Sequence, residues 1–259
     1  MTGNIDIKKI QPSTTFIGKN VVHFKNIGST NDAAKENTYK NGTVIIADTQ
    51  TMGKGRMGRE WVSENKAGIY MSIVLTPEIS AEKISLLTLV AGISVCEALM
   101  EICNMSFKIK WPNDIVADGK KVCGILTEGV ILPKKTKAIV GIGINVNQKN
   151  FTDDLCNKAT SLYLLSAKTF EREKIINKVC EAFEKNYMDF ISNKLFKEKY
   201  ESLCVNINRK ITATKNGTQI DGTALGITNS GELIIKKEDG TTLNINSGEV
   251  SVRGIYGYY

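Results

Sequence analysis

The sequence is poor in histidine and has no closely spaced cysteine pair. His23 is the only histidine, and it lies in an alternating segment that predicts a strand. A lone histidine in that setting favours a surface or half-buried structural position over a catalytic one. The six cysteines are spread through the chain without a C-x-x-C pair. Buried free thiols are therefore expected in place of disulfide bonds or a zinc site.

The sequence also has no segment that predicts export or membrane insertion. Its start, Met-Thr-Gly-Asn-Ile-Asp-Ile-Lys-Lys, lacks the apolar region of a signal peptide. Within the expected helical region 81–103, the longest uncharged stretch runs from Ile84 to Cys96 and is too short to span a bilayer. We therefore expect a cytoplasmic protein with reduced thiols and no membrane partner.

The composition is that of a soluble protein with an excess of positive charge. The 259 residues suit one large domain, or one domain with a small appendage. Hydrophobic residues make up 42% of the chain, which is enough to bury a core. The formal net charge of +7 points to acidic partners, which include nucleotides, nucleic acids and acidic proteins, and does not choose among them.

The most distinctive stretch is a glycine-rich, cationic segment at 50–61. Its glycines and cations alternate ahead of an aromatic residue, in the order Gly53, Lys54, Gly55, Arg56, Gly58, Arg59 and Trp61. Glycine lets the backbone approach a ligand closely, and interleaved cations favour an anionic ligand. We interpret the segment as a loop that wraps a phosphate-bearing nucleotide, with a solvated basic turn as the alternative.

The same segment matches G-x-G-x-x-G, the motif of dinucleotide-binding folds, from Gly53 to Gly58. That motif requires a helix directly after its last glycine. Residues 68–75 instead predict a second strand. A dinucleotide-binding fold is therefore not favoured.

The chain up to about residue 204 predicts a mixed succession of strands and helices. Strands are expected at 20–27, 43–49, 67–75, 107–111, 115–117, 120–131 and 136–147, and helices at 33–39, 81–103, 169–190 and 193–202. Asp118-Gly119 is a strong hairpin signal. Gly141 and Gly143 share one face of the last of these strands, which often marks close approach by a ligand or another backbone.

Three polar residues, Ser29, Thr30 and Asn31, precede the first expected helix. Ser29 or Thr30 is a suitable N-cap. The alternative is that these hydroxyl and amide groups bind a polar ligand at the helix N-terminus. Taken alone, the segment favours the cap.

Residues 205–259 have a different character. Short β-rich runs at 208–214, 219–228, 231–236, 241–246 and 249–253 alternate with turn signals, among which is Asp221-Gly222. Closely spaced turn signals suggest a small meander or barrel. We therefore expect one domain at 1–204 and a second, smaller one at 205–259.

Several separated motifs occur in the order found in one known family. They are Ser-Thr-Asn at 29–31, Gln50 ahead of the loop 53–59, Trp61, Lys-Trp-Pro-Asn-Asp at 110–114, Lys121 with Gly124-Ile125, Gly-Ile-Gly-Ile-Asn-Val at 141–146 and Gly-Glu-Val-Ser-Val-Arg at 248–253. Over residues 20–255 the chain resembles the biotin–protein ligases (biotin–acetyl-CoA-carboxylase ligases), in the class without an N-terminal DNA-binding domain. It departs from the family loop at Lys54 and Met57, where arginines are usual.

The resemblance implies an α+β fold with a mixed, mainly antiparallel sheet packed with helices, as in class II aminoacyl-tRNA synthetases and biotin–lipoate ligases. A small C-terminal β-barrel of the Src-homology-3 type would follow. It implies that biotin attacks ATP, assisted by Mg²⁺, to give biotinyl-5′-AMP and pyrophosphate. A lysine of a biotin carboxyl carrier protein would then take the biotin.

The resemblance also implies roles for individual residues. Arg56 and Lys121 would hold the carboxylate and the α-phosphate, and Lys110 would steady the pyrophosphate. Asn113 and Asp114 would ligate Mg²⁺, with orientation of Lys110 or assistance in amine transfer as the alternative role of Asp114. The implied biotin-binding set is Ser29, Thr30, Asn31, Gln50, Gly53, Lys54, Gly55, Arg56, Lys121, Gly124, Gly141 and Gly143. The implied ATP-binding set is Arg56, Arg59, Trp61 (stacked on adenine), Lys110, Asn113, Lys121 and Asn145.

Two alternatives stay open at this point. Lipoate–protein ligases share the fold and the acyl-adenylate chemistry, but their Arg-Arg-x-Ser-Gly-Gly-Gly signature is absent from the sequence. The net charge of +7 also permits a nucleic-acid-binding protein. The C-terminal region has no aromatic stacking series and no recognition helix precedes residue 20, so we expect no specific DNA binding. The basic surface would instead meet an acidic acceptor domain, and homodimerisation is left open.

Overall fold

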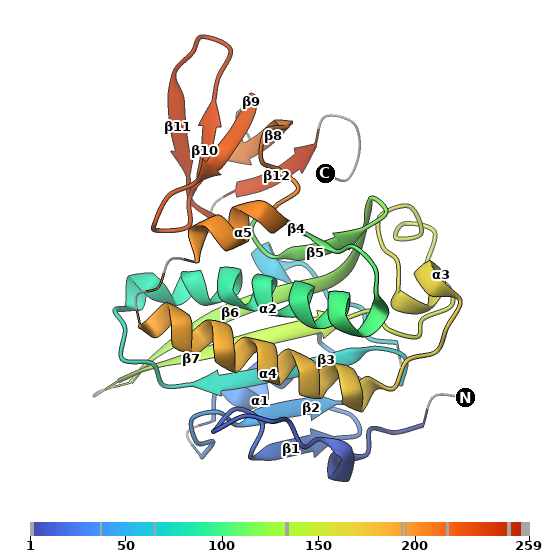
Figure 1. Cartoon of the computed structure of the whole chain (residues 1–259). Coiled ribbons are helices and arrows are strands. Elements are labelled where there is room, and N and C mark those ends of the chain that lie inside the picture. The colour runs from blue at the N-terminus through green and yellow to red at the C-terminus, as the bar shows by residue number, and fades with distance from the viewer. Residues whose placement is uncertain are drawn as a thin grey trace.

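Two β-sheets organise the chain in the computed structural model, which describes residues 3–36, 38–64, 66–132, 135–192, 194, 196–215, 218–247 and 250–254 (Figure 1). The larger sheet has seven strands in the order β1-β2-β3-β7-β6-β5-β4. These are β1 (Val21–Phe24), β2 (Val44–Ala47), β3 (Ile69–Leu75), β4 (Lys108–Lys110), β5 (Asp114–Ala117), β6 (Lys120–Leu132) and β7 (Lys135–Ile144). Strands β1 and β2 are parallel and the other neighbouring pairs are antiparallel, which confirms the expected mixed sheet.

Helices lie on both faces of this sheet. They are η1 (Ile7–Lys9), α1 (Thr30–Ala34), η2 (Arg56–Gly58), η3 (Ala81–Ser85), α2 (Leu86–Cys103), α3 (Leu162–Ser166), α4 (Arg172–Ile191) and α5 (Lys197–Leu203). Helices α2 and α4 run side by side across one face (Figure 1). Successive side chains along each strand point to opposite faces of the sheet. Ile73 and Ile142 belong to the main core on one face, whereas Val74 and Ile139 pack with Ala34 of α1 on the other. Helix α1 therefore covers the opposite face.

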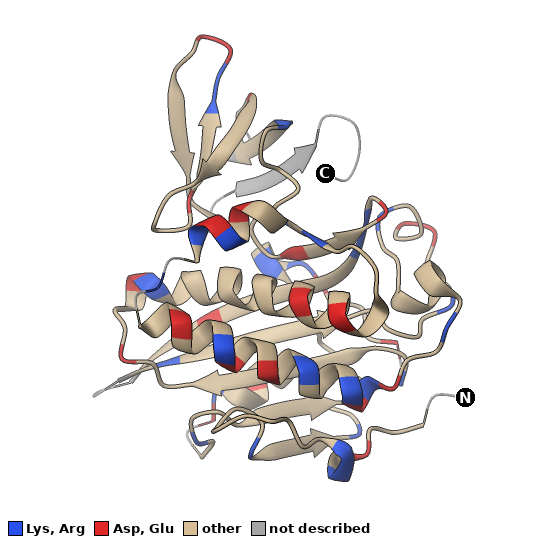
Figure 2. Ribbon diagram, in the orientation of Figure 1, with Lys and Arg blue, Asp and Glu red and all other residues tan. Residues whose placement is uncertain are grey.

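Helix α2 is the central element of the main core. Most of its side chains are buried, which is typical of a helix enclosed between a sheet and a second helix. Charged residues instead recur along the α4 ribbon (Figure 2). The segment Ala81–Cys103 is long and apolar enough to cross a membrane by length and composition, with a mean hydropathy of 1.9, yet 67% of that window is buried in the protein. The whole helix, expected at 81–103, thus meets a length and composition criterion that its uncharged part Ile84–Cys96 does not.

The smaller sheet lies at the end of the large sheet that carries β4 and β5 (Figure 1). Its strands run in the order β11-β10-β9-β8-β12. They are β8 (Lys210–Lys215), β9 (Thr218–Ile227), β10 (Leu233–Lys236), β11 (Thr242–Ile245) and β12 (Val250–Gly254). All neighbouring strands are antiparallel, as the turn signals predicted. The division at 204/205 stays a prediction, and it falls between α5 and β8.

A buried tryptophan joins the two sheets. Trp111 is 1% exposed. Its backbone N–H donates to Asn206 Oδ1 at 2.7 Å, and its indole N–H donates to the Gly231 carbonyl at 3.1 Å. The buried apolar residues of the small sheet belong to the same cluster as those of the large one. The small sheet is therefore fixed next to β4 and β5.

Two local predictions were wrong. Asp221-Gly222 lies inside β9 and is not a turn, because the strand continues with Asp221 opposite Thr212 of β8. A Cβ at Gly222 would come within 2.6 Å of the Lys236 carbonyl on β10, so this glycine serves close strand packing. The first helix is Thr30–Ala34 and not 33–39, so the 29–31 motif lies at its first turn.

A carboxylate on α4 holds the N-terminal segment. Glu184 accepts hydrogen bonds from the backbone N–H groups of Phe16 and Ile17, both at 2.9 Å, and from the N–H and hydroxyl of Thr15. Burial tends to raise the pKa of Glu184, but these hydrogen bonds lower it below its ordinary value overall. The ionised form is thus the one that stabilises the fold.

We predict that Glu184→Gln lowers the free energy of unfolding at pH 7 by about 1–3 kcal/mol, because a neutral amide replaces an acceptor of several N–H groups. The folded pKa is the lower one, so the stabilisation is present above the unfolded pKa of about 4.3 and is lost as pH falls through the folded pKa. Urea unfolding of both proteins at pH 7 and at acidic pH measures this. Glu171→Gln, at an exposed ion pair with Lys174, is the control with no measurable change. A deficit that is equal at both pH values would contradict the assignment.

Candidate active site

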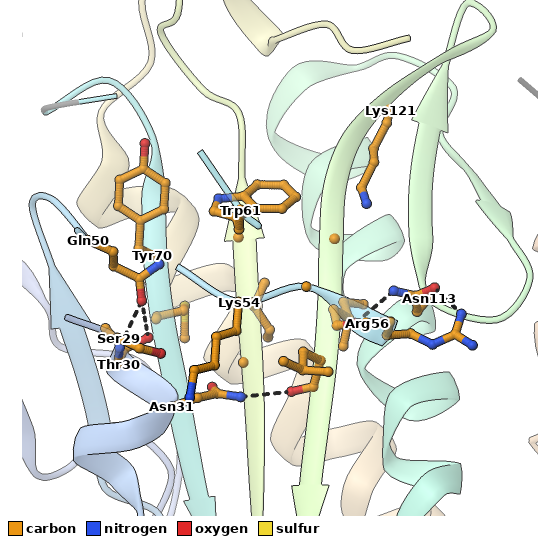
Figure 3. Close-up of a pocket in the computed structure, with 18 residues that line it drawn as sticks. Ser29, Thr30, Asn31, Gln50, Lys54, Arg56, Trp61, Tyr70, Asn113 and Lys121 are labelled. Atoms are coloured by element: carbon orange, nitrogen blue, oxygen red, sulfur yellow. Dashed lines mark hydrogen bonds between the residues drawn. The ribbon is translucent and has the colours of Figure 1, made fainter. Parts of the chain in front are cut away.

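A pocket of about 460 Å³ opens on the face of the large sheet that carries α1 (Figure 3). Side chains from α1, the 50–61 loop and strands β3, β6 and β7 surround it. The lining residues are Ser29, Thr30, Asn31, Gln50, Lys54, Gly55, Arg56, Trp61, Tyr70, Met71, Asn113, Lys121, Gly124, Ile125, Leu126, Gly141, Ile142 and Gly143. Residues far apart in the sequence are thus brought to one place.

Most residues expected at the site line this pocket. Those that do not are Gly53, Arg59, Lys110, Asp114 and Asn145. Sequence reasoning gave no site role to Tyr70, Met71, Ile125, Leu126 and Ile142, although Ile125 and Ile142 lie within the quoted motifs. Strand alternation was the available signal for two of these, because Leu126 shares its face with Gly124, and Tyr70 is paired with Gly143.

Three glycines form the floor of the pocket. A Cβ at Gly141 would overlap the side-chain oxygen of Asn31. A Cβ at Gly143 would lie 2.6 Å from the Trp61 ring, and one at Gly124 would lie 2.7 Å from it. Real Cβ atoms do not come this close to their neighbours, so only glycine allows these side chains to rest against the strands. The predicted close approach is thus made by Asn31 and Trp61.

One side of the pocket is neutral and polar. Gln50 Oε1 accepts from the backbone N–H and the hydroxyl of Thr30, at 2.8 and 3.0 Å. Ser72 donates to Asn31 Oδ1 at 2.6 Å and lies 2.8 Å from Thr30 Oγ1. Ser29 occupies the N-cap position of α1, but its side chain makes no capping hydrogen bond. The preference for a simple helix cap at Ser29 was therefore wrong, and Thr30 is engaged with Gln50.

The other side of the pocket is cationic, and Figure 3 shows Arg56, Asn113 and Lys121 across from Thr30 and Gln50. Arg56 Nη1 donates to Asn113 Oδ1 at 3.0 Å, and its Nη2 reaches the Ser247 carbonyl of the C-terminal region. Burial lowers the pKa of the Arg56 guanidinium, and nearby Asp114 acts in the opposite direction. A cation removed from water beside a pocket favours an anionic ligand there.

Lys121 has two neighbours on this side. Its Nζ lies 2.6 Å from Asp114 Oδ1 and 5.3 Å from the centroid of a Trp61 ring. The carboxylate thus balances the ammonium group, and the indole adds a cation–π contact. Lys110 is buried on β4, opposite Asp114 in the ladder with β5.

The glycine–cation loop folds back on itself. Gly55 N–H donates to the Arg59 carbonyl at 2.7 Å, and Trp61 N–H donates to the Gly53 carbonyl at 2.9 Å. Lys54 Nζ forms an ion pair with Asp32 of α1 at 2.7 Å. The loop runs into the following β3 without a helix like that of dinucleotide-binding folds, because η2 is a single short turn.

The departure from the family loop at Met57 faces away from the pocket. Its side chain is 58% exposed and does not line the site. Its backbone has φ 56°, in the left-handed region that a residue with a side chain rarely adopts. Loss of arginine at this position therefore leaves the described pocket lining unchanged.

The residues expected to hold Mg²⁺ do not form a magnesium site by themselves. Asn113 Oδ1 accepts from Arg56, and Asp114 Oδ1 is paired with Lys121. Among the residues that the structure describes, no group of three or more His, Cys, Asp or Glu side chains is suited to a metal. Magnesium prefers six oxygen ligands and is repelled by neighbouring cations. Asn145 is likewise committed elsewhere, since its Nδ2 donates to the Thr160 carbonyl at 3.0 Å.

Comparison with known proteins agrees with this architecture. Residues 23–147 match the Biotin/lipoate A/B protein ligase family, and residues 207–253 match the biotin protein ligase C-terminal domain. The second match favours the biotin branch of the first family over the lipoate branch.

Similar whole proteins point the same way. The bifunctional ligase/repressor BirA of Bacillus spizizenii is 38% identical over 236 residues, which span 88% of this chain and 72% of that protein. A biotin--[acetyl-CoA-carboxylase] ligase of Mycobacterium tuberculosis is 29% identical over 81% of this chain and 78% of its own length. The solved biotin protein ligase from Aquifex aeolicus, in complex with biotin and ATP, has 37% identity and a TM-score of 0.81, covering 91% of this chain and 99% of that one. The chain therefore belongs to the biotin protein ligase family.

Proposed function

We propose that the protein activates biotin with ATP and transfers it to a lysine of a biotin carboxyl carrier protein. The observation that carries this proposal is the division of the pocket into a neutral polar side and a cationic side (Figure 3). Biotin has the matching chemistry, with a ureido ring at one end and a carboxylate at the other. The ring would lie against Thr30, Asn31 and Gln50, and the carboxylate would point to Arg56 and Lys121.

In the first step, a carboxylate oxygen of biotin bonds to the α-phosphorus of ATP as the bond to pyrophosphate breaks. The two reactants are both anions, so their approach needs fixed positive charge. Arg56 and Lys121 supply it from neighbouring positions on the cationic side. Lys121 is held in place by Asp114 and would exchange part of this contact for the phosphate.

The remaining ATP contacts are assigned by the family resemblance. Trp61 rests on Gly124 and Gly143, where its indole ring would stack on adenine. Lys110, Arg59 and Asn145 do not line the pocket, so their proposed contacts with pyrophosphate or ribose would lie beyond it. Magnesium would arrive with the ATP phosphates, because the protein oxygens alone do not fit it.

In the second step, the amine of the acceptor lysine attacks the carbonyl of the mixed anhydride and AMP leaves. A free lysine has a pKa of about 10.4, so it must lose a proton to react at neutral pH. Asp114 is our candidate for directing that amine, since it lies beside Lys121 at the cationic side. The basic net charge of +7 would favour an acidic acceptor domain, and the setting would be the cytoplasm.

We predict that pyrophosphate release from ATP depends on biotin and is absent with lipoate or octanoate. The polar side of the pocket offers donors and acceptors to a ureido ring, whereas the dithiolane ring of lipoate and the alkyl chain of octanoate have no N–H or carbonyl group to pair with them. A coupled phosphate assay with purified protein, ATP, Mg²⁺ and each acid measures this. Release with lipoate in place of biotin would overturn the proposed substrate.

We predict that Arg56→Ala reduces formation of biotinyl-5′-AMP by about 100-fold, or lets the adenylate escape, because a cation placed at the developing charge is removed. Chromatography of the filtrate and of the protein fraction separates these outcomes. Lys83→Ala removes an exposed cation outside the pocket and is the matched control. Full formation and retention of the adenylate by the Arg56 variant would contradict the assignment.

A further inference from the structure

A carboxylate just outside the pocket controls the orientation of one of its polar side chains. Glu128 lies on β6, and it shares a face of the strand with the pocket residues Gly124 and Leu126. It does not line the pocket itself. Its Oε2 accepts from Asn31 Nδ2 at 2.7 Å, and Asn31 is only 4% exposed.

This contact fixes which way the Asn31 amide points. Its Nδ2 also lies 3.3 Å from the Leu126 carbonyl, so two acceptors face the nitrogen. On the other side, Ser72 donates to Asn31 Oδ1 at 2.6 Å. A flipped amide would place its oxygen against the Glu128 carboxylate and the Leu126 carbonyl, which are both acceptors. Glu128 therefore selects the orientation in which Oδ1 faces Ser72.

The orientation of Asn31 determines the proton on Ser72. Asn31 Oδ1 can only accept, so the single hydroxyl proton of Ser72 points to it. Ser72 Oγ can then only accept from Thr30, which lies 2.8 Å away. The hydroxyl proton of Thr30 is directed to Ser72 or to Gln50 Oε1 at 3.0 Å. In either case the Thr30 oxygen keeps its lone pairs for the pocket.

The charge of Glu128 is balanced away from the pocket. Its Oε1 pairs with Lys35 Nζ at 2.9 Å, and Lys35 also pairs with Asp32 at 2.8 Å. The hydrogen bond to Asp32 raises the pKa of Lys35, burial opposes the rise, and the bond to Glu128 adds to it. Asp32 in turn holds Lys54 of the glycine–cation loop at 2.7 Å. One oxygen of the Glu128 carboxylate is thus paired with Lys35, and the other faces Asn31.

We propose that Glu128 is a positioning residue that sets the hydrogen-bond polarity of the pocket. Through Asn31 and Ser72 it keeps the Ser72 proton off Thr30, so that the Thr30 oxygen presents an acceptor to the substrate. Such a site recognises an N–H donor and rejects an analogue that lacks one, since a buried acceptor would then be left unpaired. The inference rests on the proposed function, with the ureido N–H of biotin as that donor.

The test compares steady-state kinetics of the wild type with Glu128→Leu and Glu128→Gln. Substrates are biotin and its analogue in which one ureido N–H is replaced by oxygen, each assayed with ATP by pyrophosphate release. Glu128→Leu should raise the KM for biotin about tenfold, the size of effect expected for one lost hydrogen bond to a charged group. The KM for ATP and kcat should stay within about twofold, since the cationic side is untouched. The preference for biotin over the analogue should fall by the same factor as the biotin affinity.

Further variants separate positioning from a general loss of structure. Glu128→Gln keeps an acceptor oxygen without the charge and should fall between Glu128→Leu and the wild type. Ser72→Ala removes the proton that Glu128 keeps off Thr30, so this variant should keep the preference for biotin, and Glu128→Leu combined with Ser72→Ala should regain the preference that Glu128→Leu alone loses. Glu101→Leu, at a surface ion pair with Lys178 at 2.8 Å, is the matched control and should behave as the wild type. If Glu128→Leu does not fold, Glu128→Gln, alone and combined with Ser72→Ala, carries the test.

Two outcomes separate the inference from the function on which it rests. If the wild type shows no biotin-dependent pyrophosphate release, the proposed function fails. If the wild type is active but Glu128→Leu keeps its biotin KM and its preference, or if adding Ser72→Ala to Glu128→Leu does not restore a lost preference, the positioning role is wrong. An equal loss of affinity for biotin and for the analogue would also overturn the positioning role. Such a loss would indicate a general structural defect, which does not distinguish the two substrates.

Discussion

The site depends on places where the large sheet has no side chains. Gly124, Gly141 and Gly143 lie on one face of two neighbouring strands, and side chains from α1 and the loop occupy the space that Cβ atoms would fill. Asn31 and Trp61 rest directly on this floor. Because strands β6 and β7 are long and paired on both sides, the floor is rigid and sets the depth of the pocket.

The two sides of the pocket follow from what the floor supports. On the neutral side, buried hydrogen bonds link Gln50, Thr30, Ser72 and Asn31, so each polar group has a fixed partner before a ligand arrives. On the cationic side, charges from the loop and from β6 lie near one another. The ion pair between Lys54 and Asp32 ties the loop to α1, so the glycine–cation loop is anchored on the neutral side.

Sequence reasoning predicted the sheet, the two long helices and most of the pocket because the relevant signals are local. Alternation and turn pairs predict strands, and Asp118-Gly119 does form the β5–β6 turn, with both residues at positive φ. The glycine–cation loop and the paired glycines on β7 are likewise visible in short segments. The family motifs supplied what local patterns do not, namely that 29–31, 56 and 121 lie together.

The features that sequence reasoning missed depend on contacts between distant segments. Glu128 and Ser72 read as ordinary strand residues, and their roles follow only from the position of Asn31 beside them. Asp221-Gly222 has the letters of a turn, but pairing with β8 and β10 keeps it in a strand. The apolar helix was predicted over 81–103, which is where η3 and α2 lie. The roles of Lys110, Arg59 and Asn145 stay predictions.

The measurement that tests the central claim most directly is calorimetric titration of biotin into Gly141→Ala. The added methyl group would displace the Asn31 side chain from the floor, so we predict that biotin affinity falls at least about tenfold, as for a lost buried hydrogen bond. Gly129→Ala on β6 is the control, since its Cβ would meet its nearest neighbour at an ordinary 3.5 Å. Wild-type affinity for biotin in the folded Gly141 variant would contradict the claim that this floor positions the recognition groups.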